Sequence, residues 1–143
     1  MSTLVDRIHT AVQSFRRGIE AGIMQSVGTD ITAPQMFMLY FINQKEKCKL
    51  TQIAERLGVK PSAVTVMIDR LENAGYVVRG DDPLDRRSIL VELTDSGREV
   101  LARAVAKRNE IISSYFTKLQ PDERELVTRL MEKMVEDEVR DQL

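Results

Sequence analysis

Apolar residues recur at spacings of three and four near both ends of the chain, which is the pattern of amphipathic helices. At the start, residues 2–27 carry one such stripe, and the turn-forming residues 28–30 are expected to end the helix. Near the other end, stripes run over residues 95–119 and from Pro121 onward, where the proline and two acids favour a new helix. We therefore expect one long helix at the start and two at the end.

A second predicted helix begins after Thr32, which can cap it, with Gln35 at the reciprocal position of a capping box. The residues that follow, 36–42, are apolar on every face, so this helix is expected to be surrounded by protein and to end near Asn43. A charged connector, 45–49, comes next, and the expected order of elements places a short strand in it.

The middle of the chain, residues 50–97, changes pattern twice. A short helix over 50–57 is stopped by Gly58, which can take the left-handed conformation, and Pro61 opens another helix that runs to about residue 74. This order is the helix-turn-helix pattern. Residues 76–79 and 88–93 then have the β-branched content of strands, and residues 80–85, rigidified by Pro83, are expected to form the turn between them.

These elements predict a mainly α fold with a small β-wing, a winged helix-turn-helix. The order is two helices, a short strand, two helices, a strand, the wing, a strand and two helices. Residues 32–96 are expected to form a DNA-binding lobe, and residues 1–31 and 97–143 a helical dimerisation lobe. The terminal apolar stripes are too long for the small module to cover, which favours a two-fold homodimer with two reading heads about 34–36 Å apart. A monomeric helical bundle is the alternative.

Composition changes this picture little. The net charge is −1, and residues 45–98 hold ten basic and nine acidic side chains, so DNA binding must depend on placed groups. The longest apolar run has seven residues, far short of the roughly 20 that a membrane span needs. A single cysteine and the lack of a secretory signal favour a reducing, cytoplasmic compartment.

Five motifs in the central stretch together resemble the MarR family of bacterial transcription regulators. They are Leu50-Thr51-Gln52-Ile53-Ala54-Glu55-Arg56-Leu57, Pro61-Ser62-Ala63-Val64-Thr65, Asp69-Arg70-Leu71-Glu72 with Gly75-Tyr76-Val77, Asp85-Arg86-Arg87, and Leu93-Thr94-Asp95-Ser96-Gly97. The resemblance covers about a third of the chain. It implies an obligate dimer that binds a pseudo-palindromic operator, usually as a repressor. Many members release DNA on binding a small phenolic or lipophilic ligand, or on cysteine oxidation.

The second helix of the helix-turn-helix has one face of residues suited to DNA. Ser62 and Thr65 can hydrogen-bond bases or phosphates, and Arg70 can read guanine. Val66 stands where the family often has a basic residue, and it can contact a thymine methyl group instead. Capping by Ser62, and an ion pair of Arg70 with a neighbouring acid, are the alternatives. The full predicted DNA-binding set is Lys60, Pro61, Ser62, Ala63, Thr65, Val66, Arg70, Asp85, Arg86 and Arg87, with Arg56 as a further phosphate candidate.

In the wing, alternation along a strand puts Asp85 and Arg87 on one side and Arg86 on the other. Asp85 is therefore expected to pair with Arg87 and hold it in place. The family resemblance implies that Arg87 enters the minor groove, where narrow A/T-rich tracts attract arginine. An ordinary exposed ion pair is the alternative.

Other chemistry has little support. Cys48 lies beside two lysines that could lower its pKa, so a thiol redox-sensing regulator is one alternative. Another is a winged helix used for protein–protein contact. His9 is the sole histidine, which excludes a histidine-rich zinc site, and the acidic group Asp81, Asp82 and Asp85 is expected to be a solvated turn. No enzymatic motif is present, and we expect neither catalysis nor a cofactor.

An effector pocket is expected where the terminal helices meet the reading module. It would take a small aromatic or lipophilic ligand. The residues proposed to line it are Phe15, Met36, Phe37, Tyr40, Phe41 and Tyr115. The same side chains can equally be ordinary core.

Overall fold

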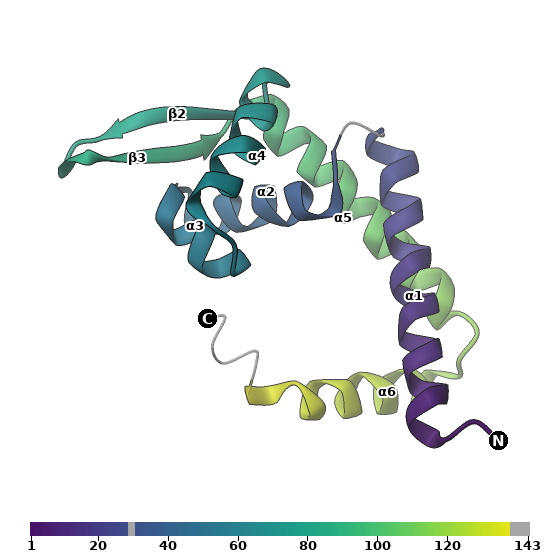
Figure 1. The fold of residues 1–143 in the computed structure, drawn as a ribbon. Coiled ribbons are helices and arrows are strands. Elements are labelled where there is room, and N and C mark those ends of the chain that lie inside the picture. Colours follow the sequence, from purple (N-terminus) through teal and green to yellow (C-terminus); the bar gives the residue numbers. More distant parts are fainter. Residues whose placement is uncertain (29–30, 138–143) are drawn as a thin grey trace. The chain divides into compact units, whose positions relative to one another are not determined.

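The computed structural model describes residues 1–28 and 31–137, which divide into two compact units, Met1–Arg108 and the residues from Asn109 onward. The elements are α1 (Leu4–Val27), α2 (Ala33–Lys45), β1 (Lys47–Lys49), α3 (Leu50–Leu57), α4 (Pro61–Asn73), β2 (Val77–Asp82), β3 (Asp85–Leu93), α5 (Asp95–Phe116) and α6 (Pro121–Met134) (Figure 1). This order confirms the predicted winged helix-turn-helix, including the short strand in the charged connector. Thr29 and Asp30, expected to help end the first helix, lie outside the described residues.

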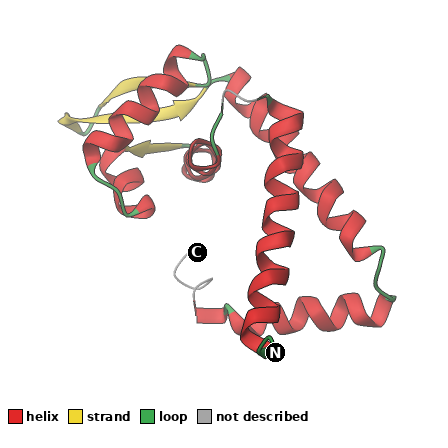
Figure 2. Ribbon diagram, turned by 45° about the vertical axis from the view of Figure 1, so that its right-hand side comes forward, coloured by secondary structure: helices red, strands yellow, loops and turns green. Residues whose placement is uncertain are grey.

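The three strands form one antiparallel sheet in the order β1-β3-β2 (Figure 2). Strands β2 and β3 are longer than predicted. The expected turn over residues 80–85 is wrong, because pairing continues to Asp82 and resumes at Asp85, leaving only Pro83 and Leu84 between the strands. Pairing uses backbone groups, which Gly80 and Asp81 supply as well as any β-branched residue does. The composition signal for strands therefore missed six of the fifteen strand residues of the hairpin, all of them at its tip.

The core of the first unit lies between α2, α3, α4, the sheet and the beginning of α5. Its fully buried side chains include Met38, Leu39, Ile42, Cys48, Ile53, Val64, Ile68, Leu71, Val77, Val91 and Val100. The helix-turn-helix is held by Gly58, which ends α3 in the left-handed conformation at φ 64° as predicted.

Helix α2 begins as predicted, but its packing differs from the prediction that protein surrounds it on every face. Thr32 and Gln35 form the expected reciprocal capping box. The prediction that protein surrounds the helix is wrong for this chain, because Phe37 and Tyr40 are 40% and 38% exposed. Their face lies opposite the buried one that Met38 and Ile42 supply. A helix that is apolar all round therefore keeps one apolar face open here.

The first and last helices, α1 and α6, bury no residue completely within the part of the chain that the structure describes. Helix α1 has no buried residue, and its stripe is open at Leu4, Ile8 and Val12, which are 77%, 49% and 52% exposed. In the second unit, α6 also has no buried residue, and Leu130 and Met134 are 48% and 65% exposed. No helix in the described part of the chain is long and apolar enough to cross a membrane.

A clasp joins the end of α4, the root of the wing and the start of α5. The Thr94 hydroxyl donates to the Gly75 carbonyl and accepts from the Gly97 N–H, while the Thr94 N–H donates to the Tyr76 carbonyl at 3.0 Å. Gly97 lies so close to Tyr76 that an added Cβ would stand 2.0 Å from the Tyr76 carbonyl oxygen. The Leu-Thr-x-x-Gly motif thus has a steric basis in this chain.

Candidate nucleic-acid interface

Helix α4 divides into a buried face and an exposed face, as its sequence predicts. Val64, Ile68 and Leu71 are in the core. The predicted DNA-binding residues of this segment are all exposed: Lys60, Pro61, Ser62, Ala63, Thr65, Val66 and Arg70. The N-cap position belongs to Lys60, so the proposed alternative role for Ser62 as the cap is wrong. The Thr65 hydroxyl donates to the Pro61 carbonyl at 3.1 Å, which leaves its oxygen able to accept from outside the helix.

Arg79 of β2, which sequence reasoning missed, pairs with both acids of α4. Its guanidinium contacts the Asp69 carboxylate and lies 3.5 Å from Glu72 Oε2, and its backbone N–H donates to the same Glu72 oxygen at 3.1 Å. The arginine is half-buried, at 24% side-chain exposure, against 50% for Asp69. The sequence did contain a signal for this contact. Arg79 is a cation in the predicted strand that follows the helix, and the helix carries two acids three residues apart. The contacts tie the recognition helix to the wing.

This arrangement also decides the state of Arg70. The ion pair of Arg70 with Asp69 or Glu72, the alternative to DNA contact, is not formed, since side chains one or two residues apart on a helix do not face each other and both acids contact Arg79. Within the ranges that the structure describes, the exposed Arg70 guanidinium has no ion-pair partner. It is therefore available for a ligand outside the chain.

Asp85 organises the start of β3 through the backbone. Its Oδ1 accepts from the Arg87 N–H at 3.0 Å and its Oδ2 accepts from the Ser88 hydroxyl at 2.9 Å. These two bonds, the backbone bond first, hold the pKa of Asp85 below its ordinary value of 3.8, so the group is a carboxylate at neutral pH. The predicted pair between the Asp85 carboxylate and the Arg87 guanidinium is wrong. The acid holds the main chain of Arg87 and leaves its charged end without an ion-pair partner among the described residues.

The register of the hairpin places Arg79 on the same side as the recognition helix. Arg79 pairs with Val91 across the strands, so both side chains leave the sheet on one face, and Arg79 reaches α4 from there. Toward the tip the register is irregular, since Asp81 pairs with Ile89 and Asp82 with Asp85, which leaves Arg86 and Arg87 without cross-strand partners. Because Arg87 lies beyond the part of the hairpin that α4 covers, its side chain is exposed.

Asp82 departs from the predicted solvated turn. It is 7% exposed, and its Oδ1 accepts from the Leu84 N–H at 2.9 Å while its Oδ2 lies 3.8 Å from Lys49 Nζ of β1. The carboxylate therefore braces the two-residue turn. No group of three or more metal-ligating side chains occurs in the part of the chain that the structure describes.

Cys48 is part of β1 and is 1% exposed, not part of an open charged connector. Burial raises the pKa of the thiol from 9.0 to about 11, and Lys45 opposes that rise only in part. The expectation that Lys47 and Lys49 would lower this pKa is wrong, because their side chains lie at the surface while the thiol points into the core.

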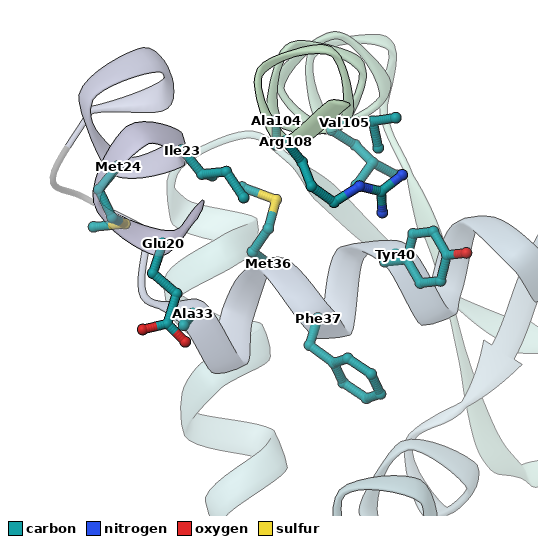
Figure 3. A pocket seen from close by; sticks show the side chains of 11 residues that line it. Glu20, Ile23, Met24, Ala33, Met36, Phe37, Tyr40, Ala104, Val105 and Arg108 are labelled. Atoms are coloured by element: carbon teal, nitrogen blue, oxygen red, sulfur yellow. The ribbon is translucent and has the colours of Figure 1, made fainter. Parts of the chain in front are cut away.

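A cavity of about 360 Å³ lies between α1, α2 and the part of α5 in the first unit (Figure 3). Met36, Phe37 and Tyr40 line it as predicted. Phe15 and Phe41 do not, since Phe41 packs against the core, and Tyr115 belongs to the second unit. The lining residues that sequence reasoning missed are Glu20, Ile23, Met24, Ala33, Leu101, Ala104, Val105 and Arg108.

The cavity combines apolar walls with a few polar groups at its edge. In Figure 3, Met36 points from α2 toward α5, and Ile23 and Met24 close the side that α1 forms. Arg108, Glu20 and the Tyr40 hydroxyl supply the polar atoms. Such a site suits a small, mostly apolar molecule with one or two polar groups.

Comparison with known proteins gives consistent results. A family model described as the MarR family matches residues 31–89. The HTH-type transcriptional repressor MdtR of Bacillus subtilis (strain 168) is 34% identical over 121 residues, which are 84% of this chain and 78% of that protein.

Solved structures show the same likeness. RV1404 from Mycobacterium tuberculosis is 29% identical, with a TM-score of 0.84 over 95% of this chain and 94% of that chain. A mutant MarR from E. coli complexed with operator DNA has a TM-score of 0.70 over 94% of this chain and 99% of that chain; its identity of 24% supports the fold alone.

Proposed function

The chain belongs to the MarR family of DNA-binding transcription regulators, and from this premise we propose that it is a homodimeric repressor of a two-fold symmetric operator, released by a small ligand. The site of action of such a regulator is the bacterial cytoplasm. The observation that carries the proposal is the pairing of Arg79 with both acids of α4. While Arg79 holds these acids, Arg70 on the recognition helix has no ion-pair partner among the described residues, and Arg87 on the wing has none because Asp85 bonds its backbone N–H.

Contacts with DNA divide into two groups. Ser62, Thr65, Val66 and Arg70 are suited to base edges in the major groove, where hydroxyls, a methyl-contacting valine and an arginine all have partners. Lys60, together with Pro61 and Ala63 at the helix start, lies where phosphates are bound. On the wing, Asp85 holds the backbone of Arg87, and the proposed role of the exposed Arg87 side chain is to enter the minor groove, with Arg86 beside it.

Dimer formation explains the open apolar faces. Large exposed apolar surfaces on a folded chain mark contact sites, and both α1 and α6 carry them. We assign residues 1–31 and 97–143 to the dimerisation lobe and residues 32–96 to the DNA-binding lobe. Pairing also compensates for a reading head of nearly neutral charge, since two weakly binding heads on one operator bind far more tightly than one.

The cavity between α1, α2 and α5 is the proposed effector site, and small aromatic or lipophilic molecules are the proposed effectors. Phe37 connects it to the reading head: its ring lines the cavity, and Arg56 of α3 lies 5.9 Å from the ring centroid. A ligand that moves this ring changes the setting of Arg56, a candidate phosphate contact. Operator release then follows from displacement of the helix-turn-helix.

The thiol-sensing alternative has less support, because Cys48 is buried with a raised pKa. The protein–protein alternative would need a wing and recognition helix without available cations, and Arg70 and Arg87 are both exposed.

The proposal is tested by selecting bound DNA from a random pool and measuring affinity for the enriched site in a gel shift. We expect an inverted repeat with half-sites about one helical turn apart. Arg70→Ala should weaken binding by about tenfold or more through loss of a base contact. Arg103→Ala, which removes an exposed arginine of α5, is the matched control and should bind like the wild type. Enrichment of no site, or equal effects of both substitutions, would refute the proposed reading surface.

A further inference from the structure

The turn between β2 and β3 presents a large apolar side chain to solvent. Leu84 is 95% exposed, more than any other large hydrophobic residue of the described part of the first unit except Met1. Figures 1 and 2 show this turn at the far end of the hairpin, beyond α3 and α4. The leucine therefore contributes almost nothing to the core of this chain.

Turn chemistry does not call for leucine at this position. Two-residue hairpin turns favour glycine, asparagine and aspartate, and Pro83 already restrains the first of the two turn residues. Scattered exposed leucines are common on proteins, so exposure alone would carry no meaning. Two further observations distinguish Leu84, namely how firmly the turn holds it and which side chains flank it.

The backbone of Leu84 is braced from both sides. Its N–H donates to the buried Asp82 carboxylate, whose other oxygen lies 3.8 Å from Lys49 Nζ of β1. The next residue, Asp85, accepts from the Arg87 N–H and the Ser88 hydroxyl. A side chain on such a turn loses little further backbone entropy when it enters a groove.

Two cations close to Leu84 indicate that the tip of the hairpin binds DNA. Arg86 and Arg87 follow Leu84 within three residues and are both exposed, so that they can reach phosphates beside a groove that receives the tip. Proteins that bind the minor groove combine such cations with apolar side chains that they insert as wedges against the base steps.

We propose that Leu84 is an apolar wedge that enters the minor groove ahead of Arg87 and makes operator affinity depend on the deformability of the base step it meets. This inference rests on the proposed function. Flexible pyrimidine–purine steps at the wing position are then preferred, since they unstack at lower cost. Because the contact is apolar, it releases no counterions, and its loss leaves the salt dependence of binding unchanged.

The test compares Leu84→Ala, Leu84→Asn and Leu84→Met on the operator enriched by the wild-type protein, with affinity measured over a range of salt concentrations. We expect Leu84→Ala and Leu84→Asn to lower affinity by about tenfold, through loss of an apolar contact on each of two wings. Leu84→Met, of similar size and polarity, should restore most of it. The slope of log affinity against log salt should not change in any of the three, whereas Lys60→Ala should reduce it.

Thermal unfolding provides the structural control, because a side chain that is 95% exposed should leave Tm unaltered when truncated. Wild-type affinity in Leu84→Ala, or a loss accompanied by a reduced salt slope, would overturn the wedge while leaving the proposed function intact. An unchanged preference for the base step at the wing position in Leu84→Ala would overturn it as well. If the wild-type protein enriches no DNA site, the proposed function and the wedge both fail.

Discussion

Replacement of Gly97 by alanine tests the packing at the root of the wing. The new Cβ would lie 2.0 Å from the Tyr76 carbonyl oxygen, and the separation must grow by roughly 1.5 Å to reach an ordinary contact. The neighbour is backbone, which cannot rotate away as a side chain can. Overpacking of this kind costs about 1–3 kcal/mol, and the Thr94 N–H bond to the same carbonyl, worth about 1 kcal/mol, is weakened.

One effect opposes these costs. Alanine is a better helix former than glycine by at most about 1 kcal/mol, and Gly97 lies in the first turn of α5, where the gain is smaller. The net expectation is a loss of about 2 kcal/mol, which for a chain of this size lowers Tm by about 6–8 °C.

Thermal unfolding followed by circular dichroism, at one fixed protein concentration because the chain is proposed to dimerise, measures this change. Gly80→Ala is the matched control. Its added Cβ would meet no atom within 4 Å, so its stability should stay within about 0.5 kcal/mol of the wild type. If Gly97→Ala unfolds at or above the wild-type temperature, helix propensity outweighs the clasp, and the steric account of the Leu-Thr-x-x-Gly motif is wrong.

Four further predictions concern residues of the proposed DNA-binding lobe. Arg87→Ala should weaken operator binding by about tenfold or more in a gel shift while the protein stays folded and dimeric, and unchanged affinity at physiological salt would remove Arg87 from the interface. Arg79→Ala should lower both Tm and operator affinity, although Arg79 is not proposed to touch DNA, because the recognition helix then loses its ion pairs to the wing and Asp69 and Glu72 remain as unpaired anions; a variant with normal affinity would refute this positioning role. Cys48 should resist peroxide and thiol reagents at neutral pH in the folded protein, with the same DNA affinity before and after treatment. Because folding raises the pKa of this thiol, its favourable contribution to stability is complete below pH 9.0 and is lost as the pH rises toward about 11. Wild type should therefore lose more stability over that interval than Cys48→Ala, and equal losses would contradict the burial of the thiol.

Local signals in the sequence were sufficient for most of the fold. The capping box of Thr32 and Gln35, the stop at Gly58 and the start at Pro61 act over a few residues, so their outcome can be read from neighbouring positions alone. The exposed face of α4 follows from its helical period in the same way. Strand ends were predicted poorly, because the pairing of Gly80 and Asp81 depends on a partner strand and not on their own side chains.

The sequence predicted which residues belong to the candidate site better than it predicted the contacts between them. Arg70 and Arg87 were identified from their position in known motifs. The acids beside Arg70 are held by Arg79, which lies ten residues from Asp69 in sequence and across the helix–strand contact in space. The guanidinium of Arg87 has no ion-pair partner in the described part of the chain, because Asp85 bonds its backbone N–H. The three cavity residues from α2 were expected, whereas those from α5, such as Ala104 and Arg108, come together with them only in the folded chain.

The amino-acid sequence by itself determined the order of elements, the starts of helices α2 to α6 and the family, because each rests on period, capping and short motifs. Tertiary structure decided which charges pair, that the thiol is buried and how the wing is braced. These properties depend on distances between residues far apart in the chain, and a small change in such a distance alters an ion pair or a pKa. The same reason explains why the sequence pattern did not single out Leu84. The proposed role of Leu84 depends on its exposure at the end of a braced hairpin, and both the exposure and the bracing are properties of the folded chain.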